Sequence, residues 1–250
     1  YTGGLIGYIT SAGDITDVSA TGRVNAGGNE VGGLVGRLDH ERHGYYNRFR
    51  YELRDARATG TVTSDGQYVG GLIGRHRFAE GVTNVTAAGD VTTDGDLVGG
   101  LFGYSQSTRI VTATASGTVD TDGNQAGGLI GKFQGSTIRD ASAAGDVTSR
   151  SDGYVGGLVG YYRDRQARDD SEIANVSAAG DVTGTHHFVG GLIGRAQSDE
   201  NNHQTTITDA HAQGDVTLTS PSANSYTGGL IGYITSAGDI TDVSATGRVN

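Results

Sequence analysis

The sequence has no cysteine, methionine or tryptophan, and a single proline, among its 250 residues. The absence of cysteine excludes disulfides, and one proline excludes a proline-rich linker or polyproline tract. Only 35% of the residues are apolar and 7% aromatic, so a conventional globular core is not expected. No apolar run approaches the roughly 18 residues of a transmembrane helix, and a signal-peptide pattern is missing from the start of the sequence. We therefore expect a soluble segment without a membrane span.

Positive charge is also scarce, since 18 basic residues stand against 28 acidic ones and the formal net charge is −10. Lys132 is the only lysine, and 22 of the acids are Asp. This balance disfavours binding to nucleic acid. A lysine-poor, Asp-rich surface is typical of extracellular proteins from high-salt organisms, where screening reduces self-repulsion. The alternative is an ordinary acidic secreted protein.

Glycine is abundant, with 44 residues, but it follows no Gly-X-Y triplet, which excludes collagen. It marks an internal repeat of about 29 residues with insertions. A Gly-Gly-Leu-(Ile/Val/Phe)-Gly box, hereafter the Leu box, begins at Gly3, Gly32, Gly70, Gly99, Gly127, Gly156, Gly190 and Gly228. A second glycine follows each of the first seven boxes, at Gly22, Gly60, Gly89, Gly117, Gly145, Gly180 and Gly214.

Apolar residues recur at fixed distances from the second glycine, at positions minus seven, minus four, minus two and plus two. The last three share the period of two that indicates strands with one buried face, whereas a helix would not tolerate this glycine density. We therefore predict an all-β fold, a parallel β-solenoid with roughly three short strands per coil, in which like residues stack about 4.8 Å apart. Residues 1–250 would form one solenoid of about eight coils. Whether Leu34 or Val35 faces inward stays open.

The boxes resemble the GLUG motif, a repeat family named for the Gly-Leu-x-Gly pattern seen from Gly4 to Gly7 and from Gly71 to Gly74. The resemblance covers essentially the whole chain. It implies right-handed β-helical coils in large bacterial and archaeal surface proteins, including adhesins, in which the repeats are generally non-catalytic. Because the motif residues belong to the scaffold, the resemblance assigns no activity.

Residues 1–25 recur letter for letter as residues 226–250, so seven coils make a superrepeat of 225 residues. Recent tandem duplication is our preferred explanation, and artificial repetition of one coil is the alternative. The sequence starts and stops inside this pattern without a capping element, which would leave strand edges open to head-to-tail association. We expect a piece of a longer array, or a protomer that stacks into one.

Length variation lies mainly at one corner of the coil, where we expect inserted loops at 38–52, 161–172 and 195–206. Two of these loops combine aromatic rings with guanidinium groups, a composition enriched at interfaces. A lateral filament contact, a glycan or a surface layer is the expected partner; simple shielding of the coil edge is the alternative. The candidate contact residues are Tyr45, Tyr46, Arg48, Arg50, Tyr161, Tyr162 and Arg163.

Two polar columns could carry chemistry. The residue after the second glycine is acidic at Asp90, Asp146, Asp181 and Asp215, which could share Ca²⁺, although solvated surface acids are the preferred interpretation. The position five before the second glycine holds Asp, Asn or Thr and is interpreted as a corner ladder. Two members of that column, Asn84 and Asn175, also satisfy the glycosylation sequon.

Catalytic signatures are weak, because no carboxylate pair stands out from the repeats and neither a nucleophile triad nor a phosphate loop is recognisable. We expect a non-enzymatic, extracellular structural protein without a cofactor, acting as a rigid filament or adhesin stalk on the surface of a halophilic microbe. The alternative function is that of a polysaccharide-binding or polysaccharide-degrading β-helix.

Overall fold

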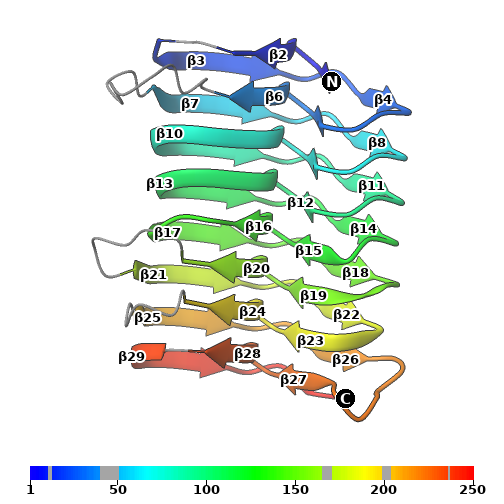
Figure 1. Cartoon of the computed structure of the whole chain (residues 1–250), viewed down its shortest axis with the longest axis vertical. Helices are drawn as coiled ribbons and strands as arrows, with labels where there is room; N and C mark the ends of the chain where they lie inside the picture. The colour runs from blue at the N-terminus through cyan, green and yellow to red at the C-terminus, as the bar shows by residue number, and fades with distance from the viewer. Residues whose placement is uncertain (11–12, 40–50, 165–170, 199–203, 236) are drawn as a thin grey trace.

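The computed structural model describes residues 1–10, 13–39, 51–164, 171–198, 204–235 and 237–250. Within these ranges the regular elements are all strands, and no helix is long and apolar enough to cross a membrane. The strands form three parallel sheets along the axis (Figure 1), two of which extend from the first coil to the eighth and one from the first coil to the seventh. The fold is a parallel β-solenoid, as the repeat pattern predicted.

Sheet A holds the residues that lead into each Leu box, and its eight strands pair in sequence order. Its strands are β1 (Thr2–Gly3), β5 (Val31–Gly32), β9 (Val69–Gly70), β12 (Val98–Gly99), β15 (Gln125–Gly127), β19 (Asp152–Gly156), β23 (His186–Gly190) and β27 (Tyr226–Gly228). Sheet C follows each second glycine and has seven strands. They are β4 (Val24–Ala26), β8 (Val62–Ser64), β11 (Val91–Thr93), β14 (Val119–Thr121), β18 (Val147–Ser149), β22 (Val182–Gly184) and β26 (Val216–Leu218).

Sheet B is the largest sheet, with 14 strands. It contains the strands that leave the Leu box, namely β2 (Ile6–Ile9), β6 (Val35–Asp39), β16 (Ile130–Phe133), β20 (Val159–Arg163), β24 (Ile193–Gln197) and β28 (Ile231–Thr235). It also contains the strands before the second glycine, namely β3 (Ile15–Ala20), β7 (Glu52–Ala58), β17 (Thr137–Ala143), β21 (Ser171–Ala178), β25 (Thr205–Ala212) and β29 (Ala237–Ala245). In coils three and four the two segments join into β10 (Ile73–Ala87) and β13 (Phe102–Ala115).

This arrangement changes the expected strand count. Three strands per coil hold for coils three and four, whereas the other complete coils have four. The joined strand β10 stays paired with β13 through the corner, with one register shift between Arg77 and Ala79, where Phe78 has a left-handed φ of 65°. In coils two, six and seven the inserted residues interrupt this path between β6 and β7, β20 and β21, and β24 and β25.

The core lies in two groups along the axis. One group, beneath sheet B, contains the Leu-box leucines and the apolar columns at minus seven, minus four and minus two. The other, between sheets A and C, is built almost wholly of valine, including Val62, Val69 and Val91. These columns are buried in the inner coils, as their period of two predicted, and each fully buried Val, Leu or Ile side chain stabilises the fold by roughly 1.5–3 kcal/mol.

The corner after the paired glycines settles the orientation of Leu34 and Val35. Both side chains are buried, at 0% and 2% exposure. The Leu34 carbonyl accepts hydrogen bonds from the amides of both Leu5 and Ile6 in the first coil, at 2.9 and 3.1 Å. Because one carbonyl serves two consecutive donors, the backbone turns there and consecutive side chains both point inward.

The paired glycines are required by close approach between coils. A Cβ on Gly71 would lie 2.1 Å from the carbonyl oxygen of Gly100 in the next coil, which is far inside van der Waals contact. A Cβ on Gly89 would similarly lie 2.1 Å from the Gly60 oxygen. The glycine columns therefore set how closely the coils stack.

The polar column five before the second glycine has a left-handed backbone in every coil. The φ values range from 50° at Asp209 to 57° at Thr112. Asp and Asn enter this region at lower cost than other non-glycine residues, which explains their dominance in the column. The corner ladder expected from the sequence is thus a row of left-handed residues within sheet B; its members are Asp17, Asp55, Asn84, Thr112, Asp140, Asn175, Asp209 and Asp242.

Candidate interaction surface

Two outward columns run side by side along the junction of sheets A and B. The box column lies five residues after the first glycine of each Leu box and consists of Tyr8, Arg37, Arg75, Tyr104, Lys132, Tyr161, Arg195 and Tyr233, which pair rung by rung. The lead column lies two residues before that glycine and consists of Tyr1, Glu30, Tyr68, Leu97, Gln125, Tyr154, Phe188 and Tyr226. Together they form what we call the stripe. Every member of the box column is aromatic or cationic.

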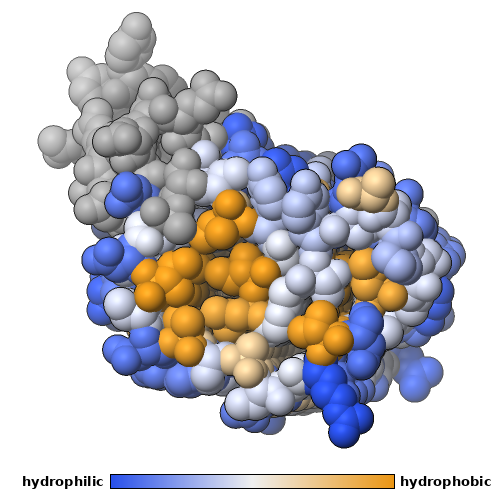
Figure 2. All heavy atoms as spheres, turned by 90° about the horizontal axis from the view of Figure 1, so that it is seen from below, coloured by the Kyte–Doolittle hydropathy of each residue, from blue (hydrophilic) through white to orange (hydrophobic). Residues whose placement is uncertain are grey.

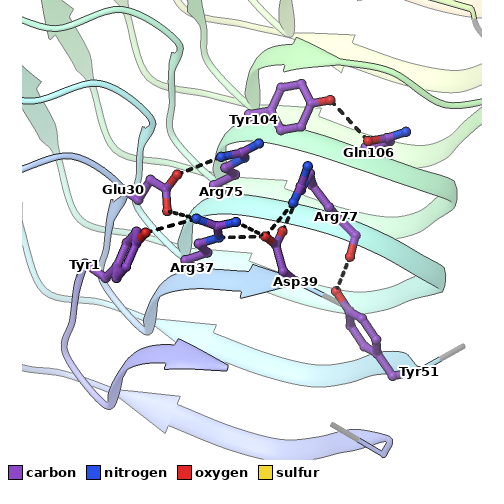
Figure 3. Close-up of polar contacts among 9 residues, drawn as sticks. All are labelled: Tyr1, Glu30, Arg37, Asp39, Tyr51, Arg75, Arg77, Tyr104 and Gln106. Atoms are coloured by element: carbon purple, nitrogen blue, oxygen red, sulfur yellow. Dashed lines mark hydrogen bonds and ion pairs between the residues drawn. The ribbon is translucent and has the colours of Figure 1, made fainter. Parts of the chain in front are cut away.

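At the first three coils of the stripe, arginines lie between aromatic rings and share one carboxylate (Figure 3). The Arg75 guanidinium is 5.2 Å from the centre of the Tyr68 ring and donates to Glu30 Oε1 at 2.9 Å. The Arg37 guanidinium is 5.0 Å from the Tyr8 ring and 3.5 Å from Glu30 Oε2. Glu30 is 5% exposed, so this carboxylate offsets two cations in a poorly solvated position.

Asp39 anchors the same region from the end of β6. Arg77 donates to both of its carboxylate oxygens at 2.7 Å, and Arg37 Nε donates to Oδ2 at 2.6 Å. Burial acts to raise the pKa of Asp39, but the two guanidinium groups outweigh it and hold the pKa below its usual range. Burial likewise opposes the charged form of Arg37, but Asp39 and Glu30 outweigh it and raise the pKa of Arg37 above its usual value. Asp39, Arg37 and Arg77 are therefore ionised at neutral pH.

Arg195 is the centre of the stripe in coils six to eight. Its guanidinium carbon lies 5.3 Å from the ring centres of Tyr154 and Phe188, 5.6 Å from that of Tyr161 and 5.7 Å from that of Tyr233. The rings also contact one another, and Phe188 stacks on Tyr226 at 5.3 Å. Each cation–π contact contributes roughly 0.5–1 kcal/mol when exposed and more when desolvated, so the cluster is held together from several sides.

Backbone strain accompanies the stripe in its lead column. Glu30, Tyr68 and Leu97 have φ values of 58°, 60° and 59°. A left-handed backbone costs a bulky side chain of order 1–3 kcal/mol and persists where the surroundings impose it. The left-handed conformation places these side chains at the junction between the sheets, where they contact the box column.

The contact residues predicted in the inserted loops have different outcomes. Tyr45, Tyr46, Arg48 and Arg50 lie outside the described residues. The prediction is wrong for Tyr162, because this residue belongs to β20, is fully buried and stacks on Phe133 at 5.8 Å. Tyr161 also lies in β20 and is only 8% exposed, since its outward ring is covered within the stripe. Arg163 is the last residue of that strand and is partly exposed.

The direction in which each side chain of β20 points, inward or outward, explains this outcome. Consecutive strand residues point to opposite faces, so Tyr161 joins the stripe while Tyr162 enters the core column of Leu38, His76 and Phe133. The loop boundaries shift accordingly: β6, β20 and β24 continue to Asp39, Arg163 and Gln197.

The acidic column after the second glycine forms a ladder of side chain to backbone bonds. Asp146 Oδ1 accepts from the amide of Asp181 at 2.9 Å, and Asp181 Oδ1 accepts from the amide of Asp215 at 2.8 Å. Asp90 and Asp215 accept in the same way from Thr118 and Arg248. One oxygen of each carboxylate is thus engaged, and no group of three or more His, Asp or Glu suited to a metal occurs in the described ranges.

Asn84 and Asn175 lie on the outer face of sheet B, in the left-handed column. Both are exposed. Their side-chain amides donate to Asp55 Oδ1 and Asp140 Oδ1 in the preceding coil, the latter at 2.5 Å. Each amide therefore gives the carboxylate of the preceding coil a hydrogen-bond donor. The Asn side chain itself stays accessible to solvent.

Sequence reasoning missed the stripe, although its two columns keep a constant offset from every Leu box. The signal was available as an aromatic or cationic residue five positions after the first glycine in all eight boxes. Alignment on the second glycine, on which the apolar columns depended, obscured it because the leg between the two glycines varies in length.

Comparison with known proteins agrees with the repeat assignment. The family described as the GLUG motif matches residues 1–25, 151–183 and 223–250, so the chain carries GLUG repeats in these regions. A stretch of 38 residues, 15% of this chain, is 66% identical to halomucin of Haloquadratum walsbyi. The match covers 0% of halomucin's length when rounded to a whole per cent, so the chain corresponds to a very small part of this relative. No solved structure matches the chain.

Proposed function

We propose that this chain is a segment of a rigid extracellular rod, a filament or adhesin stalk on the surface of a halophilic microbe. The observation that carries the proposal is unbroken parallel pairing from the first coil to the eighth in sheets A and B. Backbone hydrogen bonds along the axis link every rung to the next, so extension would require breaking many of them together. The match to a protein named halomucin supports the saline, extracellular setting.

The axial faces support a continuing stack. In the last coil Tyr226, Ile240 and Val249 are 46%, 41% and 51% exposed, and the apolar residues of this face gather inside a hydrophilic rim (Figure 2). Leu5 and Ile6 are 52% and 39% exposed at the opposite face. A further coil, from the same chain or from a second copy, would bury both the apolar groups and the open strand edges.

We propose a non-catalytic role for the described coils. They do hold a Ser–His–Asp chain, in which His211 Nδ1 lies 2.8 Å from Ser244 Oγ and His211 Nε2 lies 2.9 Å from Asp209 Oδ1. The His211 and Asp209 side chains are 43% and 57% exposed, so solvent screening weakens the interaction by which Asp209 would orient the imidazole. Release of reducing sugars from polysaccharides by the purified chain would contradict this proposal.

The rod is tested by cryo-electron microscopy of native material in high salt. We expect continuous rods with a repeat of roughly 34 Å, which corresponds to seven rungs at the strand spacing. Discrete short particles would contradict a filament or stalk. They would favour the second candidate, a single polysaccharide-binding module, for which the aromatic and cationic stripe is the specific supporting feature.

A further inference from the structure

The Arg195 cluster differs from the first three coils of the stripe in its charge balance. Arg37 and Arg75 pair with Glu30, and Arg37 also pairs with Asp39. In the described part of the chain, by contrast, no carboxylate forms an ion pair with Arg195. Its hydrogen-bond acceptor there is the Tyr154 hydroxyl, at 3.0 Å from Nη1, and its Nε is buried without a partner. Among the described residues, the cluster thus keeps a cation without a carboxylate partner.

Arg195 carries its positive charge on a chain with a net charge of −10. The outward column of sheet C that includes Thr63, Thr92 and Thr148 holds mainly Thr, with Asp120 among its members. A local positive charge on an acidic rod attracts an anion, and a guanidinium presents a planar fork that matches a carboxylate or sulfate. Arg195 lies among aromatic rings, whereas Arg37 and Arg75 also lie beside the carboxylate of Glu30.

The rings supply the second half of a binding surface. Tyr154 and Phe188, in coils six and seven, and Tyr233 are each partly exposed. Phe188 lies nearly parallel to Tyr226, at 8° between ring planes, and is tilted by 32° from Tyr154. The apolar face of a pyranose ring stacks on such aromatic surfaces, while a sugar acid also offers a carboxylate. A polymer of acidic sugars fits both features and the linear form of the stripe.

We propose that the Arg195 cluster binds an acidic polysaccharide whose chain lies along the rod axis. The sugar carboxylate accepts from the Arg195 guanidinium, and neighbouring sugar rings pack on the exposed parts of Tyr154 and Phe188. A second copy of the stripe is a poorer partner, because four cations and one carboxylate in each stripe would face each other. The proposal rests on the rod as the scaffold that holds the stripe straight.

The test measures binding of polygalacturonate to the full chain by isothermal titration calorimetry, at low and at high NaCl. Dextran serves as a neutral polysaccharide and poly-glutamate as an acidic polymer without sugar rings. The variants are R195Q, which removes the cation, and F188S, which removes a partly exposed ring from coil seven. R150Q is the matched control, because Arg150 is an exposed arginine whose ion pairs with Asp120 and Asp122 lie in and just after sheet C, outside the stripe.

We expect polygalacturonate to bind the wild-type chain and R150Q alike, and R195Q at least about tenfold more weakly, since a hydrogen bond to a charged group contributes roughly 1.5–3 kcal/mol. F188S should also weaken binding, and salt should weaken it further because exposed charges are screened. Absence of wild-type binding, equal affinity of R195Q and R150Q, or equal binding of poly-glutamate would overturn the proposal. Rods of unchanged repeat in R195Q separate this result from failure of the rod itself.

Discussion

Burial of His76 predicts that the solenoid loses stability between pH 7 and pH 5. The imidazole is fully buried beneath sheet B, where it stacks on Phe102 at 5.3 Å and meets the edge of Tyr51 at 5.8 Å. Its Nδ1 lies 3.1 Å from Ser105 Oγ, while Nε2 is buried without a partner. Burial lowers the pKa of His76 from 6.5 to about 4, and the nearby charge of Asp39 opposes this only in part.

The sign of the effect follows from proton binding. Below pH 6.5 the unfolded chain protonates His76 while the folded chain keeps it neutral, so the unfolded state binds more protons and stability falls as pH falls. The loss is absent above pH 6.5 and complete below the folded pKa of about 4. Over the full window it amounts to roughly 3 kcal/mol, and to about 2 kcal/mol at pH 5.

The assay is urea unfolding at pH 7 and pH 5 in the same high concentration of NaCl, followed by circular dichroism. We compare the wild-type chain with H76L, because the same core column already accepts Leu38 in the preceding coil. H211Q, which removes an exposed histidine, is the control and should retain the loss because His76 is still present. The reasoning is refuted if H76L loses as much stability between pH 7 and pH 5 as the wild-type chain.

Two further predictions concern the columns that stack the coils. Gly89→Ala should destabilise the chain by roughly 3 kcal/mol because the new Cβ would meet the Gly60 oxygen at 2.1 Å, whereas Gly22→Ala, in the same column with nothing within 4 Å, should change the free energy of unfolding by less than about 1 kcal/mol. Equal effects of the two substitutions in urea unfolding would contradict the close-approach argument. Asp181→Ala should cost about 1 kcal/mol, because it removes the acceptor for the Asp215 amide, and added Ca²⁺ should leave the Tm of the wild-type chain unchanged; a rise in Tm with Ca²⁺ that Asp181→Ala abolishes would show instead that the ladder binds the ion.

The outcome for Tyr161 and Tyr162 shows where sequence reasoning was insufficient. Both were assigned to an inserted loop because the leg between the two glycines is longer in coil six, and the aromatic rings and arginines of that loop then made them contact candidates. The structure extends β20 through Arg163, which sends the two rings to opposite faces. Composition indicated an interaction surface, but the strand boundary decided which ring could belong to it.

By itself the sequence determined the β-solenoid, the length of its coils, the inward apolar columns and the polar column five residues before the second glycine. Stacking along the axis repeats each position at a fixed spacing, so a column in the alignment is a ladder in space, and periodicity is enough to find it. The tertiary structure alone decided which columns lie side by side around the cross-section. That neighbourhood depends on how the corners turn, as at Leu34, and on where the left-handed residues bend the strands. It joined the box and lead columns into one stripe and placed Arg195 among the rings of Tyr154, Phe188 and Tyr233.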